Sequence, residues 1–310
     1  MILISAAALF CQLSAALMSP MTSSATDDSL RARIERRIAE VPGATAGVAF
    51  RDLARSDTVY IGADERFHAA STMKVPVMIE LFRRAERGQI SLSQPITLKN
   101  EFASIVDGTP YSLDAKDDSD SLVYSWIGSA VSVHDLLEHM ITRSSNLATN
   151  TLIGLVGAAK ANATAHELGA KDIQVLRGVE DDKAYAAGMN NTTTARDLAV
   201  LMAAIETGKA ASPASTDSMR AILSRQEFND EIPAGLPPGT RVAHKTGQIT
   251  GHLHDAAIVY PRGRGPYVLV VLTRGIPDEK VARSLIADIS RLVYEHAMQG
   301  AGTSAARSGQ

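Results

Sequence analysis

A serine and a lysine one helical turn apart are the residues of this sequence best suited to covalent chemistry. They are Ser71 and Lys74, in the stretch Ser-Thr-Met-Lys at residues 71–74. Side chains three residues apart lie on the same face of a helix, so the lysine amine can approach the serine hydroxyl. A serine hydroxyl is a weak nucleophile and needs a base within hydrogen-bond reach. A lysine can be that base only if burial or neighbouring cations lower its pKa.

Two further motifs follow, Ser-Ser-Asn at residues 144–146 and Lys-Thr-Gly at residues 245–247. Together with residues 71–74 they match, in order, the S-x-x-K, S-D-N and K-T-G motifs of class A β-lactamases and penicillin-binding proteins. The sequence therefore resembles that superfamily of serine acyl-enzymes, over nearly the whole chain after its N-terminal segment. The middle motif departs from the pattern because Ser145 stands where the family usually has aspartate.

The residues after Lys74 favour a buried lysine over a solvated one. Ser71 and Lys74 alone would also fit an N-cap serine followed by a surface lysine. Residues 75–79 (Val-Pro-Val-Met-Ile) leave little polar face, which predicts a central, buried helix. A lysine in that place needs partners, and Asn146 together with an acid are the candidates. The resemblance implies that Lys74 is the base that deprotonates Ser71.

The middle motif supplies Ser144 and Asn146, which we expect to face the cleft. The resemblance implies that the Ser144 hydroxyl relays a proton to the leaving nitrogen of the substrate. It also implies that Asn146 orients Lys74 and the substrate amide. From the residues alone, an N-cap serine and an ordinary capping asparagine are the alternative.

The third motif is expected on an edge strand, where a cation and a hydroxyl meet a substrate carboxylate. Lys245 and Thr246 would grip that carboxylate, and Gly247 would let the substrate approach the backbone closely. The N–H groups of Ser71 and Gln248 are the expected donors of an oxyanion hole. A plain strand end is the alternative for this motif.

The residue that frees the acyl-enzyme is expected on a loop after the middle motif. The resemblance nominates Glu180 as the deacylation base and Arg177 as a residue that braces the loop. The segment 180–188 (EDDKAYAAG) is rewritten relative to the family, and Asn191 stands in place of the bracing aspartate. A solvated turn of three consecutive acids is the alternative.

Two other features carry weaker expectations. His252, His254 and Asp255 follow the third motif on one predicted strand, and histidines at i and i+2 share a face. A zinc site needs three or four convergent ligands, so we expect these residues to line or brace the cleft and expect no metal or organic cofactor. Arg274 ends the strand predicted to neighbour Lys245 and would add charge for a carboxylate, with a surface arginine as the alternative.

The elements that position these residues follow from the hydrophobic pattern. Helices are expected at 30–41, 71–87, 133–142, 145–156, 158–168, 194–207, 213–226 and 278–298, and strands at 45–52, 57–61, 242–246, 253–260 and 267–273. This order predicts an α/β (α+β) fold of two lobes, with terminal helices covering a sheet built from both chain ends. The resemblance implies a five-stranded antiparallel sheet of the β-lactamase/transpeptidase type, an inserted all-helical lobe, and an active site between them.

The ends of the chain are expected to lie outside this fold. Residues 1–25 are predicted to be a secretory signal peptide, because an apolar, nearly uncharged run precedes small residues. An uncleaved membrane anchor is the alternative, although the run is short for a span. A single catalytic domain is expected at 27–300, followed by a disordered tail at 301–310. Its α/β lobe would comprise 27–62 and 240–300, and its helical lobe 63–239.

Composition is that of an ordinary globular protein and favours a small-molecule partner. The chain has 310 residues, of which 45% are apolar and 21% charged, with a formal net charge of −3. No basic patch indicates nucleic-acid binding. We expect a secreted or periplasmic monomer, without stable membrane contact after signal removal, that hydrolyses β-lactams. The alternatives are a D-alanyl peptidase or esterase of the same superfamily acting on an acyl-peptide, a sensor that is acylated without turnover, and a structural module without chemistry.

Overall fold

The computed structural model describes residues 28–55 and 57–299. The predicted signal peptide at 1–25 and the predicted tail at 301–310 lie outside those residues. Within them, no helix is both long enough and apolar enough to cross a membrane.

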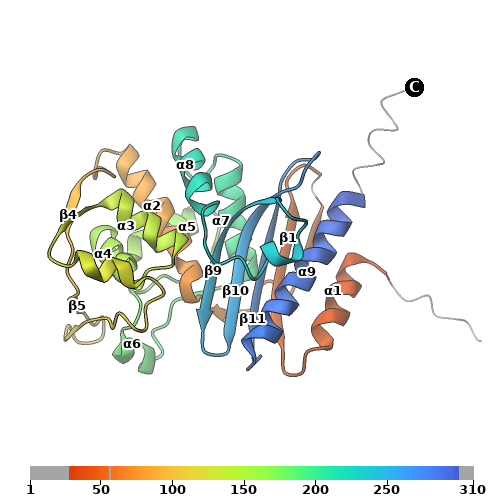
Figure 1. Ribbon diagram of the computed structural model, residues 1–310, viewed down its shortest axis with the longest axis horizontal. Coiled ribbons are helices and arrows are strands. Elements are labelled where there is room, and N and C mark those ends of the chain that lie inside the picture. The colour runs from red at the N-terminus through yellow and green to blue at the C-terminus, as the bar shows by residue number, and fades with distance from the viewer. Residues whose placement is uncertain (1–27, 56, 300–310) are drawn as a thin grey trace, which may run out of the picture.

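A five-stranded antiparallel sheet forms the centre of one side of the molecule (Figure 1). Its order is β2-β1-β11-β10-β9. The strands are β1 (Thr45–Asp52), β2 (Thr58–Ile61), β9 (Arg241–Ile249), β10 (His252–Tyr260) and β11 (Tyr267–Arg274). Strand β1 lies against β11, with Thr45 opposite Arg274, so the two ends of the chain meet inside the sheet. This architecture confirms the predicted fold class.

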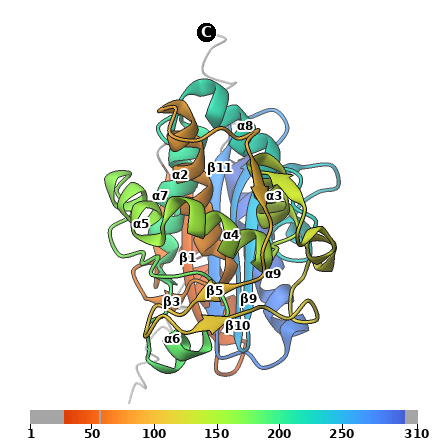
Figure 2. The same ribbon diagram turned by 90° about the vertical axis from the view of Figure 1, so that its left-hand side faces the viewer.

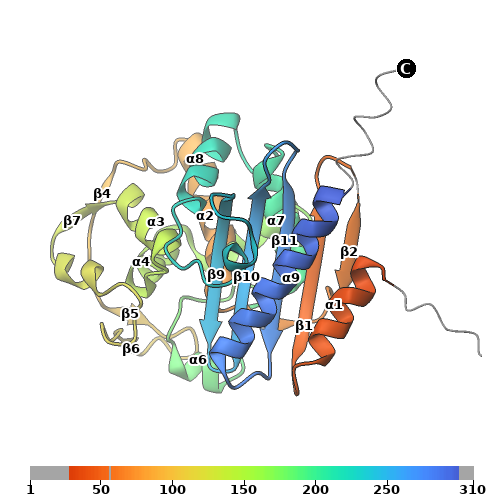
Figure 3. The ribbon, with the colours of Figure 1, turned by 45° about the vertical axis from the view of Figure 1, so that its right-hand side comes forward.

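Both faces of the sheet are covered. Figure 3 shows α1 (Leu30–Ala39) and α9 (Glu279–Gln299) side by side on one face. On the other face, α7 (Ala195–Glu206) packs against β1, β10 and β11. Successive side chains of a strand point to opposite faces, so the strands serve two cores. In β1, Val48 and Phe50 pack with the terminal helices, whereas Ala49 packs with the helical lobe.

The helical lobe is built around α2 (Lys74–Glu86), the helix predicted to be central. Every residue from Lys74 to Phe82 is buried. The surrounding helices are α3 (Val133–Thr142), α4 (Asn146–Val156), α5 (Ala158–Glu167) and α8 (Pro213–Leu223). Figure 2 faces this lobe and shows α4 crossing in front of α2. Helix α2 ends just before Gly88, which adopts a φ of 67°, a left-handed conformation that glycine accepts without strain.

Several short elements were not predicted. They are α6 (Asp182–Ala186), the 3-10 turns Ala70–Met73, Ser121–Trp126 and Pro233–Gly235, and the strand pairs β3 (Phe67–His68) with β8 (Thr192–Thr193), β4 (Pro95–Thr97) with β7 (Ala130–Ser132), and β5 (Phe102–Ala103) with β6 (Pro110–Tyr111). Such strands are too short to show a periodic hydrophobic pattern. The first turn changes one expectation, because Ser71 lies in a 3-10 turn and the α-helix begins only at Lys74.

Candidate active site

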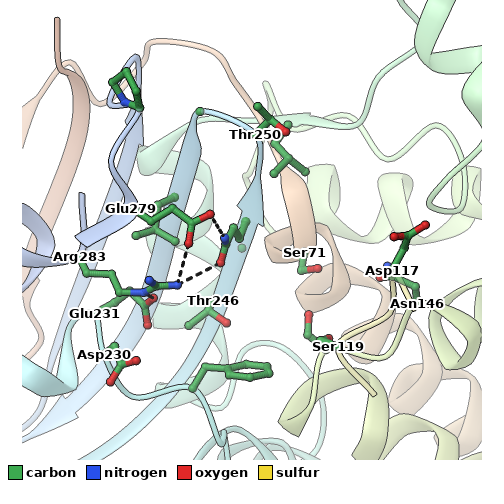
Figure 4. Close-up of a pocket in the computed structure, with 18 residues that line it drawn as sticks. Ser71, Asp117, Ser119, Asn146, Asp230, Glu231, Thr246, Thr250, Glu279 and Arg283 are labelled. Atoms are coloured by element: carbon green, nitrogen blue, oxygen red, sulfur yellow. Dashed lines mark hydrogen bonds and ion pairs between the residues drawn. The ribbon is translucent and has the colours of Figure 1, made fainter. Parts of the chain in front are cut away.

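Two cavities meet at Ser71, between the sheet edge β9 and the helical lobe. The larger has a volume of about 550 Å³ (Figure 4). Six residues predicted from the motifs line it: Ser71, Ser144, Asn146, Thr246, Gly247 and Gln248. The second, of about 470 Å³, shares Ser71 and Asn146 with the first and is also lined by Glu180. The structure therefore brings all three motifs and the predicted loop to one place.

Strand β9 runs directly against the turn that carries Ser71. A Cβ atom added to Gly247 would lie 3.1 Å from Thr72 Cγ2 and 3.2 Å from the Ser71 nitrogen. These contacts are tighter than ordinary packing, so glycine at this position lets the edge strand approach the turn. The approach places Gln248, the next residue of β9, at the border of both cavities. The missing side chain at Gly247 is therefore needed for packing against the turn that carries Ser71, in addition to its expected role in letting a substrate approach.

Lys74 is fully buried and extends toward the middle motif. Its Nζ donates to the Ser144 carbonyl oxygen at 2.6 Å and to Asn146 Oδ1 at 3.0 Å. Burial lowers the pKa of Lys74 to about 7, although the negative charges of Asp118 and Glu180 oppose the shift. An amine with this pKa is partly neutral at physiological pH and can accept a proton. The alternative of a surface lysine is wrong.

Ser144 lies between two buried lysines. Its Oγ accepts from Lys245 Nζ at 2.9 Å and lies 3.3 Å from Lys74 Nζ. Burial lowers the pKa of Lys245 well below its ordinary value, and the charge of Lys74 adds to the effect. Two like charges so close resist being present together, so one of the lysines is readily deprotonated. The Ser144 hydroxyl can pass a proton between them.

Ser145, and not Ser144, is the N-cap of α4. Its side chain accepts from the Ala148 N–H at 3.2 Å, whereas Ser144 adopts a left-handed φ of 59° just before the helix. The N-cap reading of Ser144 is therefore wrong, because the neighbouring serine satisfies the helix. Ser145, which departs from the family pattern, thus serves as the N-cap of α4.

A buried carboxylate that sequence reasoning missed also caps α4. Asp118 Oδ2 accepts from the backbone N–H groups of Asn146 at 2.8 Å and Leu147 at 3.0 Å. A negative charge at a helix N-terminus is stabilising, and this one fixes where α4 begins. No local signal identifies Asp118, because its partners lie in a distant part of the sequence.

Glu180 lines the second cavity together with Ser71 and is hydrogen-bonded to the middle motif. Its Oε1 accepts from Asn146 Nδ2 at 2.5 Å, and its φ is 58°. Burial raises the pKa of the Glu180 carboxyl, and the Asn146 hydrogen bond opposes the shift. The next residue, Asp181, is buried and accepts from the Ser104 hydroxyl and the Ile105 N–H. The reading of a solvated acidic turn is therefore wrong.

The loop that carries Glu180 is closed at its base by Arg177 and Asn191. The Asn191 side chain accepts from the Arg177 N–H at 3.2 Å and donates to the Arg177 carbonyl at 3.0 Å. The buried Arg177 guanidinium donates to the carbonyl of Met189 at 2.9 Å and to Asn190 Oδ1 at 3.0 Å. Asn191, which stands where the family pattern has aspartate, thus braces the loop through hydrogen bonds to the Arg177 backbone.

Helix α4 also holds the loop that carries Glu180, through the side chain of Asn150. Asn150 Oδ1 accepts from the Val179 N–H at 2.7 Å, and Asn150 Nδ2 donates to the Val179 carbonyl at 3.0 Å. A Cβ atom at Gly178 would lie 2.3 Å from Asn150 Oδ1, so a side chain there would displace the Asn150 amide. Both contacts keep the loop against the helix that begins at Asn146.

The histidines and aspartate of β10 have protein partners. His254 is buried, its Nε2 lies 2.9 Å from the His68 carbonyl, and its Nδ1 accepts from the Thr273 N–H. Asp255 accepts from His244 Nδ1 at 3.0 Å and from the Ile232 N–H at 3.1 Å. Both side chains brace the strand. Within residues 28–55 and 57–299, no group of three or more His, Cys, Asp or Glu side chains is arranged to hold a metal ion.

Arg274 does not neighbour Lys245, and that prediction is wrong. Strand β10 separates β9 from β11, so the two residues lie two strands apart. The Arg274 guanidinium pairs with Glu65 and donates to the Arg66 carbonyl. A different arginine, Arg283 of α9, lines the larger cavity, as Figure 4 shows.

Arg283 belongs to a small polar network at the wall of that cavity. Its guanidinium lies 3.3 Å from Glu279, 3.4 Å from Glu231 and 3.4 Å from Gln248 Oε1. The Gln248 amide donates to Glu279 at 2.6 Å. Sequence reasoning missed Arg283 because nothing local shows that the first turns of α9 reach the end of β9.

Residues 29–297 match the model of the beta-lactamase enzyme family. The beta-lactamase AST-1 of Nocardia asteroides is 28% identical over 281 residues, which cover 89% of this chain and 86% of the relative. The beta-lactamase Toho-2 of Escherichia coli is 27% identical over 260 residues, or 82% of this chain and 84% of the relative.

Solved structures show the same fold. A structure of PBP-A is 32% identical with a TM-score of 0.75, covering 87% of this chain and 96% of that chain. An acyl-enzyme complex of a PBP-A mutant with penicillin G is 30% identical with a TM-score of 0.73, covering 87% of this chain and 96% of that chain. An ancestral class A beta-lactamase is 27% identical with a TM-score of 0.76, at 86% and 100% coverage.

Proposed function

This chain belongs to the beta-lactamase enzyme family, and on that premise we propose that it hydrolyses β-lactams through an ester formed on Ser71. The hydrolase class rests on the family and on the named relatives. The ester route rests on one observation above all. Two buried lysines share the hydroxyl of Ser144, which lines the larger cavity together with Ser71.

Acylation begins with proton transfer from the Ser71 hydroxyl to neutral Lys74. Ser71 Oγ then bonds to the lactam carbonyl carbon, and the N–H groups of Ser71 and Gln248 stabilise the oxyanion. The carbon–nitrogen bond breaks when the Ser144 hydroxyl donates its proton to the leaving nitrogen. Ser144 recovers a proton from the lysine pair, so the cycle leaves Ser71 as an ester and the ring opened.

The substrate carboxylate is assigned to the third motif. Thr246 lines the larger cavity, and the buried Lys245 precedes it on β9; with Lys74 neutral as the base, the one positive charge of the lysine pair is assigned to Lys245. A cation and a hydroxyl together suit a carboxylate.

Deacylation is assigned to Glu180. A carboxyl whose pKa is raised by burial is a stronger base toward water than an ordinary one. Its hydrogen bond to Asn146 places it beside the same cavity as Ser71. Glu180 removes a proton from water, and the hydroxide adds to the ester carbonyl. The carbon–oxygen bond to Ser71 breaks as the proton taken up by Glu180 is returned to Ser71 Oγ, so that both residues regain their starting states.

The test is the intact mass of the purified protein over time after addition of a chromogenic cephalosporin, with absorbance read in parallel. Continuous colour with little adduct is the expected result, because both steps then proceed. A stable adduct with a single burst of colour supports the second candidate, a peptidase or sensor that is acylated and then stalls. That candidate is favoured by the similarity to PBP-A. If neither colour nor a mass adduct appears, the proposal is overturned.

The acylation rate should rise with pH through about 7. Lys74 accepts a proton only in its neutral form, and its pKa of about 7 places that form above neutrality. The rate of ester formation, measured by quenched-flow mass spectrometry, should level off about one to two pH units above the midpoint. Because Lys74 and Lys245 share Ser144, the midpoint belongs to the pair. A rate that does not vary with pH across this range would show that Lys74 is not the base.

The setting of the enzyme is proposed from the sequence. The segment 1–25 would direct export to the periplasm or beyond and then be removed. The remaining 27–300 would act as one catalytic domain and as a monomer, with a small-molecule substrate. N-terminal sequencing of the mature protein tests the first point.

A further inference from the structure

We propose that His68 is a positioning residue for Ser71, because its Nδ1 atom accepts the Ala70 N–H and so holds the residue before the nucleophile in a left-handed conformation. The inference rests on the proposed role of Ser71. His68 belongs to none of the three motifs and was not singled out from the sequence.

The contact involves an unusual backbone conformation. Ala70 has a φ of 45°, a region that residues with a Cβ atom rarely adopt. Its N–H points to His68 Nδ1 at 3.0 Å. A buried N–H without an acceptor is costly, so the imidazole satisfies the donor in the conformation that the turn requires. Without that acceptor, the peptide before Ser71 would be free to relax.

The histidine is itself fixed from both sides. Strand β3 pairs with β8, which sets His68 opposite Thr192. The His68 carbonyl accepts from His254 Nε2 at 2.9 Å, which ties β3 to β10. The Ala69 N–H donates to the Asn191 carbonyl at 2.8 Å, at the base of the Glu180 loop. The acceptor for Ala70 is therefore presented by a rigid frame.

The bond requires His68 to be neutral with its proton on Nε2, since a protonated ring has no acceptor. Burial lowers the pKa of His68 to about 4, and the charges of His252 and Arg177 add to the effect. Other ionisable groups around the ring come from β10, from the loop and from α6: His254, Glu180, Asp181, Asp182 and Tyr185. The acceptor is thus present throughout the neutral range.

The consequence for chemistry follows from sequence order. The Ser71 N–H, one of the two predicted oxyanion donors, comes immediately after Ala70. A rotation of the Ala70 backbone would tilt both that N–H and the Ser71 hydroxyl. Misplacement of reacting groups by about 1 Å can lower a rate by about a hundredfold.

Two substitutions separate the acceptor from the bulk of the ring. His68→Phe keeps a ring but removes the acceptor, and we expect acylation to slow by about tenfold to a hundredfold. His68→Asn offers an amide oxygen near the place of Nδ1 and should restore acylation to within a few-fold. His252→Phe is the matched control, since its ring lies 6.3 Å from that of His68 and its Nδ1 lies 3.2 Å from the Thr250 carbonyl. Acylation is read by mass, and folding by the melting temperature.

A spectroscopic test uses the unaltered protein. Long-range ¹⁵N–¹H correlation should show His68 as the Nε2–H tautomer, with Nδ1 at an acceptor shift that persists down to about pH 4. An Nδ1–H tautomer would overturn the proposal, as would a His68→Asn variant that folds normally but acylates as slowly as His68→Phe. If the unaltered protein forms no ester at all, the proposed function fails, whereas the tautomer still reports on the hydrogen bond.

Discussion

Replacing Ser71 with alanine should abolish hydrolysis of a chromogenic cephalosporin and every mass adduct of the protein. The alanine removes the only atom proposed to bond to the substrate, while the lysines and the cavities stay in place. Loss of a serine nucleophile of this kind lowers kcat by about 10⁴-fold or more. Steady-state absorbance and intact mass at saturating substrate measure both effects.

The control for this substitution is Ser125→Ala. Ser125 is exposed, and its hydroxyl donates to the Leu122 carbonyl in its own 3-10 turn. Its loss should leave turnover within a factor of about two, since surface changes of this kind are nearly neutral. An adduct that still forms on the Ser71→Ala protein would place the nucleophile elsewhere.

Replacing Glu180 with glutamine should separate the two chemical steps. Acylation by Ser71 and Lys74 should continue, because neither depends on proton transfer to Glu180. Hydrolysis of the ester should slow by about 10²-fold to 10⁴-fold, the usual contribution of a general base. The expected observation is one equivalent of colour, followed by a protein whose mass carries the opened substrate for minutes or longer.

Asp182→Asn is the matched control, since it neutralises an exposed acid two residues away in the first turn of α6. Its ester should be released at nearly the rate of the unaltered protein. If the Glu180→Gln protein also releases its ester at that rate, another group activates the water. Such a result would remove Glu180 from the mechanism and leave the role of Ser71 intact.

Much of the site was predictable because the motifs are local. The spacing of Ser71 and Lys74 is a helical spacing, and the apolar residues that follow correctly predicted a buried lysine. The alternation of helices and strands also predicted a sheet from both chain ends with helices between. The family, the fold class and the hydrolase class that these patterns indicated are confirmed.

The remainder depends on contacts between distant segments. Asp118 is a capping residue only because the chain returns to it at Asn146 and Leu147. The prediction that Arg274 neighbours Lys245 failed because two successive hairpins put β10 between β9, which carries Lys245, and β11, which carries Arg274. Consecutive antiparallel strands tend to lie side by side, so a stricter use of that tendency would have corrected the prediction. The position of Arg283 depends on where α9 crosses the sheet, which the sequence pattern does not encode.

The pairing of β1 with β11 has a consequence for the biogenesis of the protein. A ribosome delivers the chain from its N-terminus, so Thr45 cannot pair with Arg274 until the strand that carries Arg274 has emerged. The helical lobe, whose contacts are more local, can form earlier. Thr246 and Gln248, which line the larger cavity with Ser71, also arrive with the last strands. With the roles proposed for these residues, we expect the nascent protein to be unable to turn over a substrate until translation is nearly finished.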